Sequence, residues 1–418
     1  GVKIGNQNIS SNTYDPYNGG LASSSTNNGV TCTYEYDDCG NLIKVKRNGT
    51  LVHHIIYSRD GTLLESRDYS SGLATRYRYD FDGNVTGTDV YLTEGSRLSD
   101  RWVYGAEVGY DTYGRAVRTS VLTKDASYIS DVTYTASGKV ASSTYAGKTV
   151  QYTYDAIERQ TKRRVVISES SQKYLDITYS YRNSDRGTGY TTSQLEAERV
   201  GGVRYDYEYD RNGNITSIER SDSESDGTVI YTYDSHDQLI REDNPISGIS
   251  TSYSYDTNGN LKTKTRNAYV NGVIGEVIST DAYNYGSLIN GDRLTKINDE
   301  AVTYDGIGNP NNMEGWSLAW DGRRLTSMTK GNDTISFGYD SEGRRISKTV
   351  NGQTTEYFYA GDTVIGEESA ANGKITYIYD DAGRISALRR TINGATSTYH
   401  LLSNSRGDVE AIYSEDGT

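Results

Sequence analysis

Aromatic or aliphatic residues alternate with polar residues in short stretches along the chain, and each stretch ends in an Asp- and Gly-containing segment. In "YEYD", Tyr34 and Tyr36 are two residues apart, so an extended strand places both rings on one face and Glu35 on the other. Tyrosine also suits a half-buried pleated surface. Asp37 can bond its own downstream backbone, and Gly40 supplies the positive φ of a tight turn. The pattern therefore predicts a strand that ends in a tight turn.

A second strand and a second turn complete the unit. Leu42 to Val45 restart the apolar and polar alternation, and Asn48-Gly49 is a strong hairpin signal. No window shows convincing helical periodicity with caps, and the chain has only 3 Pro, so strands are rarely interrupted. One unit is therefore a strand, an Asp/Gly turn, a strand and an Asn/Gly turn.

The unit recurs along the chain with the head Tyr-Asp-x-x-Gly-[Asn/Arg]-[Leu/Ile/Val]. Clear copies are "YEYDDCGNLIKV" from Tyr34, "YRYDFDGNVTGT" from Tyr77, "YDYEYDRNGNITSI" from Tyr205, "YSYDTNGNLKTK" from Tyr253, "FGYDSEGRRISK" from Phe337 and "YIYDDAGRISAL" from Tyr377. Looser copies begin at Tyr57, Tyr110, Tyr134, Tyr233, Tyr304 and Trp320. Near the end, the tyrosines at 339, 359, 379 and 399 are 20 residues apart. A fixed period of about 20 to 24 residues is the signature of a repeat architecture.

The repeat assigns structural roles to its recurring residues. The structural tyrosines are Tyr36, Tyr79, Tyr209, Tyr233, Tyr255, Tyr339 and Tyr379, and the turn glycines are Gly40, Gly83, Gly213, Gly259, Gly343 and Gly383. A lone hairpin is marginally stable in water, whereas stacked hairpins support one another through cross-strand aromatic pairs. We therefore expect an all-β fold of tandem hairpins in a thin, curved antiparallel sheet, with tyrosines on its concave face and charges outside.

Composition agrees with a thin sheet and restricts the partners. The chain has 39 Tyr against 3 Phe and 3 Trp, only 34% of its residues are hydrophobic, and its mean hydropathy is -0.71. A tyrosine ring can pack while its hydroxyl stays hydrogen-bonded. The net charge of -13 argues against nucleic-acid binding, which needs a basic face. No apolar run reaches transmembrane length and no signal peptide opens the chain, so we expect no membrane insertion and any export signal to lie upstream.

The repeat also bounds the domain organisation. Because it runs from end to end, we expect a single repeat domain over residues 1–418 instead of the two or three domains that length alone suggests. The units become irregular near 155–203 and 262–302, where we expect longer loops or divergent hairpins and no linkers.

Residues that carry metal or redox chemistry are few. Cys32 falls in an expected strand and Cys39 at a variable turn position, so free thiols are favoured over a bridge. The four histidines at 53, 54, 236 and 400 are scattered, and the adjacent pair points to opposite faces of a strand. We expect no zinc site and no cofactor.

Several short motifs coincide with expected turns. "YDDCGN" from Tyr36 has calcium-type oxygen ligands but lacks EF-hand spacing, and its Asp has a sufficient role as a turn cap. "RGD" at 406–408 and the sequons at Asn48 and Asn84 likewise fall where the repeat places a turn. No catalytic triad or carboxylate pair can be argued from the sequence, so we expect no enzymatic activity.

The tandem units resemble the YD repeats, also called RHS repeats, of bacterial RHS and toxin-complex proteins and of animal teneurins. The resemblance covers most of the chain, and "TYHLLSNSRGDVEAIYSEDGT" from Thr398 is similar to the opening of the RHS core segment, about 398–418. It implies a spiralling β-sheet, β-solenoid-like, that forms part or all of a hollow shell, in bacteria often around a toxic C-terminal domain. The family's autoproteolytic motif lies further downstream, so no cleavage residue is assigned here.

Two functions follow as expectations. The resemblance implies a secreted or cell-surface bacterial scaffold whose partner is a downstream toxin or effector domain of the same polypeptide. The alternative is an adhesion or carbohydrate-binding module that uses exposed tyrosines on surface glycans or proteins. Such a site needs a cluster that departs from the repeat, and Trp316 and Trp320 are its candidates.

Overall fold

The structure is a computed structural model of the whole chain. It describes residues 2–4, 7–16, 20–27, 30–94, 97–123, 127–145, 147–183, 191–222, 226–286, 291–340, 343–360, 362–380 and 383–418. The described residues form β-strands joined by turns, with no helix among them.

The strands follow one another at short intervals. Those up to the middle of the chain are β1 (Val2–Ile4), β2 (Gln7–Tyr14), β3 (Ala22–Asn27), β4 (Val30–Tyr36), β5 (Leu42–Arg47), β6 (Thr50–Tyr57), β7 (Leu63–Asp68), β8 (Leu73–Tyr79), β9 (Val85–Glu94), β10 (Arg97–Tyr110), β11 (Ala116–Thr123), β12 (Ser127–Tyr134), β13 (Val140–Tyr145), β14 (Lys148–Tyr154), β15 (Gln160–Ser168), β16 (Lys173–Asn183), β17 (Thr191–Val200), β18 (Val203–Tyr209) and β19 (Ile215–Ser221). The others are β20 (Gly227–Tyr233), β21 (Leu239–Asn244), β22 (Ile249–Tyr255), β23 (Leu261–Val270), β24 (Val273–Tyr285), β25 (Leu294–Ile297), β26 (Glu300–Ala301), β27 (Asn312–Met313), β28 (Trp316–Asp321), β29 (Arg324–Lys330), β30 (Asp333–Tyr339), β31 (Arg345–Val350), β32 (Gln353–Ala360), β33 (Thr363–Ser369), β34 (Gly373–Tyr379), β35 (Ile385–Ile392), β36 (Ala395–Ser403) and β37 (Val409–Ser414).

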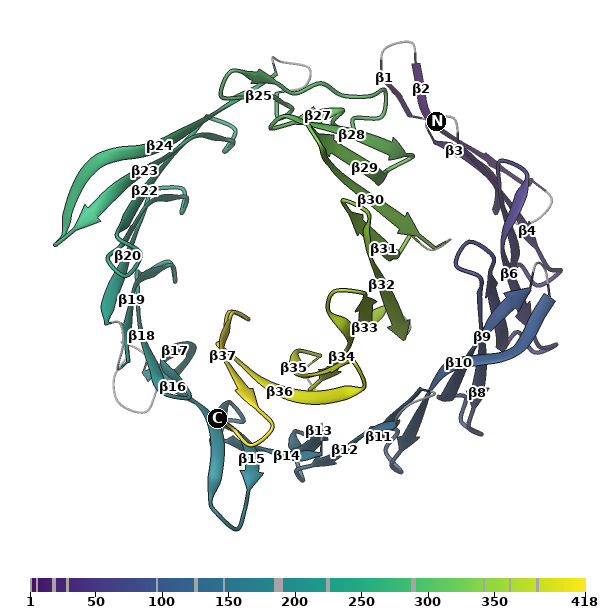
Figure 1. Cartoon of the computed structure of the whole chain (residues 1–418), viewed down its shortest axis with the longest axis horizontal. Helices are drawn as coiled ribbons and strands as arrows, with labels where there is room; N and C mark the ends of the chain where they lie inside the picture. Colours follow the sequence, from purple (N-terminus) through teal and green to yellow (C-terminus); the bar gives the residue numbers. More distant parts are fainter. Residues whose placement is uncertain are drawn as a thin grey trace.

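Within each of two sheets, every strand pairs antiparallel with its neighbours in the chain, and the two sheets together form a spiral. A 26-stranded sheet runs from β1 to β26, and an 11-stranded sheet runs from β27 to β37. In Figure 1 the first sheet traces most of a ring, and the second continues inside it, as seen in this view, until β37 lies beside β15. We call these sheets the first turn and the second turn of the spiral. The short turns between strands are called Asp/Gly or Asn/Gly turns, or are named by their residues. The expected all-β, curved antiparallel fold is therefore confirmed.

The Asp/Gly turn closes through one carboxylate. Asp37 Oδ1 accepts hydrogen bonds from the backbone N–H groups of Cys39 and Asn41 at 3.0 and 2.8 Å. Its Oδ2 accepts a bond from the Asn41 side chain at 3.0 Å, and Gly40 stands at φ +85°. The bond from the Asn41 side chain is the main cause that lowers the pKa of Asp37. In units with Arg at this position, the guanidinium replaces the amide, as Arg115 Nε does toward Asp111 at 2.8 Å.

In many units, the tyrosine that precedes the Asp/Gly turn joins one hairpin to the preceding hairpin. Its hydroxyl donates to a backbone carbonyl where a strand of the previous unit begins. These bonds measure 2.6 to 2.9 Å and run from Tyr36 to Ala22, Tyr79 to Leu63, Tyr110 to Val85, Tyr134 to Ala116, Tyr154 to Val140, Tyr233 to Ile215, Tyr255 to Leu239, Tyr339 to Leu325 and Tyr379 to Val364. The tyrosine hydroxyl thus supplies the hydrogen bond that this backbone carbonyl would otherwise need from another backbone N–H or from water.

The two sheets separate around Pro310, which follows the turn that begins at Tyr304. Pro310 stands where other units have a strand-forming aliphatic residue, but it has no N–H to donate to a ladder. Only an isolated bridge between Tyr304 and Pro310 is formed there. The tryptophan at 320 then occupies the tyrosine position of the next head, and its indole N–H donates to the Pro310 carbonyl at 2.7 Å.

The irregular stretches contain hairpins with long strands. β15 and β16 have 9 and 11 residues, and β23 and β24 have 10 and 13, against 6 or 7 in many other strands. Where longer loops were expected, residues 184–190 and 287–290 lie outside the described residues.

The main buried core lies where the second turn packs on the first. It consists of Tyr145, Val150, Tyr152, Val165, Leu175, Ile177 and Val200 from the first turn and Ile378, Ala387 and Leu402 from the second. A thin sheet thus acquires a two-layer core at this point only because the chain overlaps itself (Figure 1).

Candidate functional site

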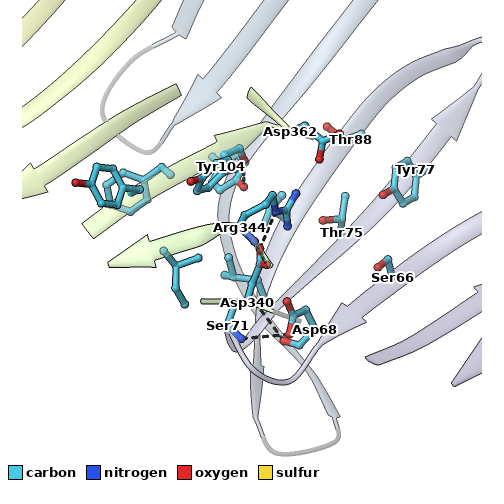
Figure 2. Close-up of a pocket in the computed structure, with 16 residues that line it drawn as sticks. Ser66, Asp68, Ser71, Thr75, Tyr77, Thr88, Tyr104, Asp340, Arg344 and Asp362 are labelled. Carbon is cyan, nitrogen blue, oxygen red and sulfur yellow. Dashed lines mark hydrogen bonds and ion pairs between the residues drawn. The ribbon is translucent and has the colours of Figure 1, made fainter. Parts of the chain in front are cut away.

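A cavity of about 320 Å³ lies between the two turns, bordered by β7 to β10 of the first turn and by β31 and β32 of the second. Figure 2 shows hydroxyl groups and aromatic rings pointing into it from both sides. Its lining residues include Ser66, Asp68, Thr75, Tyr77, Thr88, Tyr104, Asp340, Arg344, Tyr357, Phe358, Tyr359 and Asp362. The cavity is therefore polar and ring-lined, and both turns are required to form it.

Two carboxylates of the cavity accept hydrogen bonds from groups in the tight turns that follow them in the chain. Asp340 is 1% exposed and accepts from Arg344 Nε at 2.6 Å (Figure 2). Asp68 accepts from the backbone N–H groups of Ser70 and Ser71 at 2.7 and 3.2 Å. The carboxylates of Asp68 and Asp340 thus hold short turns between strands, and the cavity offers a ligand hydroxyl groups, ring faces and the carboxylate of Asp362.

Tyr104 connects the two turns at this cavity. Its hydroxyl donates to the backbone carbonyl of Tyr359, 255 positions later in the chain. Burial raises the pKa of Tyr104 to about 12, so the phenol keeps its proton and remains a donor at any physiological pH.

Further contacts hold the turns together along a surface that we call the seam. They join Arg47 to Asp321, Arg163 to Asp380, Glu198 to Ser405, and Tyr205 to Glu410. With Tyr104, they connect β5, β10, β15, β17 and β18 of the first turn to the second turn. The spiral is thus joined at intervals along its overlap.

Glu198 carries the densest of these contacts. Its side chain is buried and accepts from the Ser405 backbone N–H at 2.8 Å and from the Ser405 hydroxyl at 2.9 Å. Tyr207 donates to the same carboxylate at 2.5 Å. Burial, followed by the hydrogen bond to Glu198, raises the pKa of Tyr207 well above its usual range, which keeps this donor protonated.

Arg163 and Asp380 form a buried ion pair in the seam. Their nearest charged atoms are 3.7 Å apart, and the two side chains are 3% and 1% exposed. Arg163 also donates to the Ser386 hydroxyl at 2.8 Å, and Arg384 reaches Asp380 at 3.1 Å. A buried pair of this kind is costly to break, because either partner alone leaves an uncompensated charge.

The residues singled out from the sequence lie mostly away from the cavity. The six turn glycines have φ between +74° and +92°, at Gly40, Gly83, Gly213, Gly259, Gly343 and Gly383. Six of the structural tyrosines donate their hydroxyl to a backbone carbonyl of the preceding unit. The seventh, Tyr209, stacks on Tyr207 with ring centroids 6.5 Å apart. Trp316 and Trp320 are both half-buried in β28 and do not line the cavity.

Other predicted sites also fall into turns and strands. Cys32 and Cys39 are free thiols, in β4 and in the following turn. Asn404 takes the place of the turn Asp in the "RGD" unit, with Gly407 at φ +91°. No group of three or more His, Cys, Asp or Glu suited to a metal occurs among the described residues. Within the same residues, no helix is long and apolar enough to cross a membrane.

The cavity and the seam were not predicted from the sequence. Their residues, such as Tyr77, Tyr104 and Glu198, belong to ordinary units. A weak signal exists in the first Tyr of "YRYD" and "YDYEYD", which is not needed to cap the turn, yet nothing in one unit shows which distant unit will lie beside it.

The chain is similar to proteins of known sequence over part of its length. It is 41% identical over 132 residues to the tRNA3(Ser)-specific nuclease WapA of Bacillus spizizenii, and 36% identical over 132 residues to the tRNA nuclease WapA of Bacillus subtilis. Each match covers 30% of this chain and 6% of the relative. The chain thus corresponds to a small part of these relatives.

Solved toxin-complex structures share the fold. A crystal structure of TcdB2-TccC3-Cdc42 matches 98% of this chain and 23% of that chain with a TM-score of 0.74 at 16% identity. The Tc holotoxin pore of Photorhabdus luminescens matches the same shares with a TM-score of 0.74 at 17% identity. At such identities the likeness shows the fold.

The sequence profile of the family described as Teneurin YD-shell matches residues 156–418, which is more than half of the chain. The matched part includes four of the six clear copies of the repeat, the sheet break and the whole second turn. The repeat, the spiral and this match agree, and the chain belongs to the teneurin YD-shell family.

Proposed function

We propose that this spiral is a non-enzymatic segment of a shell that encloses or presents a toxin or effector domain located downstream in the same polypeptide. The observation that carries the proposal is the overlap of the two turns, which closes the curved sheet against itself through a buried seam (Figure 1). A wall built this way keeps its shape without a thick core. We further propose that residues 1–418 are one continuous repeat domain of a secreted or cell-surface bacterial protein.

Small-angle scattering from the purified chain tests the shell. We expect the pair-distance distribution of a strongly curved, open-centred particle. A solid compact particle or a straight rod would contradict the proposal. In the natural polypeptide, limited proteolysis should spare the downstream domain when the spiral is intact and cut it when the seam is weakened by Glu198→Ala.

A tRNA cleavage assay tests the proposal that this chain is not an enzyme. The WapA relatives are tRNA nucleases, but they are matched over only 6% of their length. The chain has a net charge of -13, which disfavours binding to a polyanion. We therefore expect purified chain to leave tRNA uncut in a gel assay, and cleavage that purifies with the chain would overturn the proposal.

Carbohydrate binding is the second candidate, and the cavity in Figure 2 is the observation that favours it. Its tyrosine rings and hydroxyl groups are of the kind that stack on and hydrogen-bond to sugars. Binding on a glycan array that is lost in Tyr357→Ala would place the sugar in the cavity. Loss in Trp316→Ala instead would favour the tryptophan site, and silence across the array would reject this candidate.

A further inference from the structure

An imidazole is buried at the centre of the seam. His400 lies on β36, is 0% exposed, and packs with its ring centroid 6.0 Å from that of Tyr145 on β13 of the first turn. In the second turn it stands opposite Ala387 of β35 and Tyr413 of β37. It is therefore part of the core that joins the two turns.

Neither ring nitrogen of His400 has a hydrogen-bond partner among the described residues. Burial, together with the positive charges of Lys148 and Arg163, lowers the pKa of His400 to about 4. In the closed seam the ring is therefore neutral at physiological pH, and a proton on it would have no acceptor to bond.

The groups around His400 would not compensate a second positive charge. Lys148 and Arg163 both act on it as cations from the first turn. Asp380, the carboxylate that pairs with Arg163 at 3.7 Å, is also engaged by Arg384 at 3.1 Å. Burial raises the pKa of Tyr145, so its phenol stays neutral and adds no negative charge. Protonation in place would thus add charge to a buried, cation-rich site.

We infer that the seam is an acid-labile latch, in which protonation of His400 releases the second turn from the first while the hairpins within each turn stay paired. The geometry supports a selective release. The ladders are held by backbone hydrogen bonds that do not titrate, whereas the seam contains ionisable side chains, with His400 buried in its core and the carboxylates of Glu198, Asp380 and Glu410 in its polar contacts. The latch is a property of the spiral and holds whether or not it carries cargo.

The direction of the effect follows from linkage. When the seam opens, His400 meets water and regains its ordinary pKa of about 6.5. The open form therefore binds a proton more readily than the closed form between pH 6.5 and 4. The closed seam has its full stability above pH 6.5 and loses it progressively as the pH falls toward 4.

Energy transfer across the seam tests the latch. Donor and acceptor dyes are placed at Ser170→Cys and Glu415→Cys in a chain whose natural thiols are replaced by Cys32→Ser and Cys39→Ser. The two sites are close, because Gly417 lies against Ile167 and Lys173. We expect transfer to fall by at least half between pH 6.5 and 4.5, reversibly, while far-UV circular dichroism retains the strand signal. A dye pair within the second turn, at Asn332→Cys and Ala395→Cys, should not change.

Variants separate His400 from the carboxylates. His400→Gln removes the titration, and we expect its opening midpoint to move at least one pH unit lower. His236→Gln is the matched control, because that side chain is 81% exposed in a turn, and it should behave like the wild type. If His400→Gln does not fold, Lys148→Gln gives the second measurement, since it removes a cation facing His400 and should also lower the midpoint.

Three results would overturn the latch. Transfer that persists to pH 4 in the wild type would show that the seam does not open. An unchanged midpoint in both His400→Gln and Lys148→Gln would place the titration on the carboxylates. Loss of the strand signal together with transfer would mean that acid unfolds the whole chain.

Discussion

At the scale of single residues, the turn depends on a backbone conformation that side chains resist. Gly213 has φ +92°, and a Cβ there would lie 3.4 Å from the Gln194 side chain. Because a β-branched residue is strained at such φ whatever the space, Gly213→Val should lower the free energy of unfolding by more than roughly 1 kcal/mol. Gly202→Val is the control, since Gly202 has open space around it and no positive φ. Equal denaturation midpoints for the two variants would contradict the role of the turn.

The tyrosine hydroxyl is the second single group on which the packing of neighbouring hairpins depends. Tyr255 donates to the Leu239 carbonyl at 2.8 Å and so joins two hairpins. Tyr255→Phe keeps the ring but leaves that carbonyl without its donor, so we expect a loss of about 1 kcal/mol in urea denaturation. Tyr113→Phe, at a ring that is 81% exposed, should cost close to nothing. A Tyr255→Phe variant as stable as the control would mean that the ring alone carries the contact.

At the scale of the element, the sequence predicts the hairpins well because each depends on local chemistry. The strand before Asp37, the turn at Gly40 and the strand from Leu42 all appear as the alternation and turn residues indicate. The break at Pro310 is less evident, because one missing N–H must be weighed against a complete Asp-x-x-Gly-Asn head. Trp320 illustrates the same limit. In the sequence its unit is only a loose copy of the repeat, whereas in the structure its ring takes the place of the repeat tyrosine and its N–H donates to a backbone carbonyl in the same way.

One element exposes an apolar edge. β24 pairs with β23 along its length, but with β25 only from Tyr283 to Tyr285. Val273, Val277 and Ile278 are each more than 60% exposed on this hairpin, which projects from the ring in Figure 1. Exposed apolar edge strands promote association between chains. We expect concentrated wild-type protein to self-associate through this hairpin.

A charge on this edge tests the expectation. Ile278→Lys should reduce the apparent mass in light scattering while changing the free energy of unfolding by less than about 0.5 kcal/mol, because the site is exposed. Ile297→Lys, at a position 8% exposed, should instead destabilise the fold. If Ile278→Lys associates as the wild type does, another surface is responsible.

At the scale of the whole molecule, sequence reasoning reaches its limit. The repeat predicts a curved sheet, but the pitch of the spiral sums small rotations over many hairpins, and no single unit encodes it. The seam brings together Glu198 and Ser405, which are 207 positions apart. In the sequence, Glu198 and His400 look like ordinary strand residues, and only the overlap of the turns buries them.

The Glu198 contact therefore offers a test of the spiral as a whole. Glu198→Ala leaves the buried Tyr207 hydroxyl and the more exposed Ser405 backbone N–H without their shared acceptor. An unsatisfied buried donor costs about 1 to 3 kcal/mol, and the Ser405 N–H can bond to water instead, so we expect a loss of about 2 kcal/mol from the docking of the second turn. Glu208→Ala is the matched control, because that side chain is 72% exposed on the neighbouring strand.

The distribution of the destabilisation along the chain shows whether Glu198→Ala detaches only the second turn or unfolds the whole spiral. Since hairpins contact mainly their neighbours, the first turn should keep its ladder when the second turn detaches. Hydrogen exchange should then accelerate in β34 to β37 and in the facing strands β13 to β17, and remain slow in β20 to β23. Uniform acceleration along the chain would show instead that the spiral unfolds as one cooperative unit. In that case the seam would stabilise every hairpin in the molecule, and the seam could not open without unfolding the sheets.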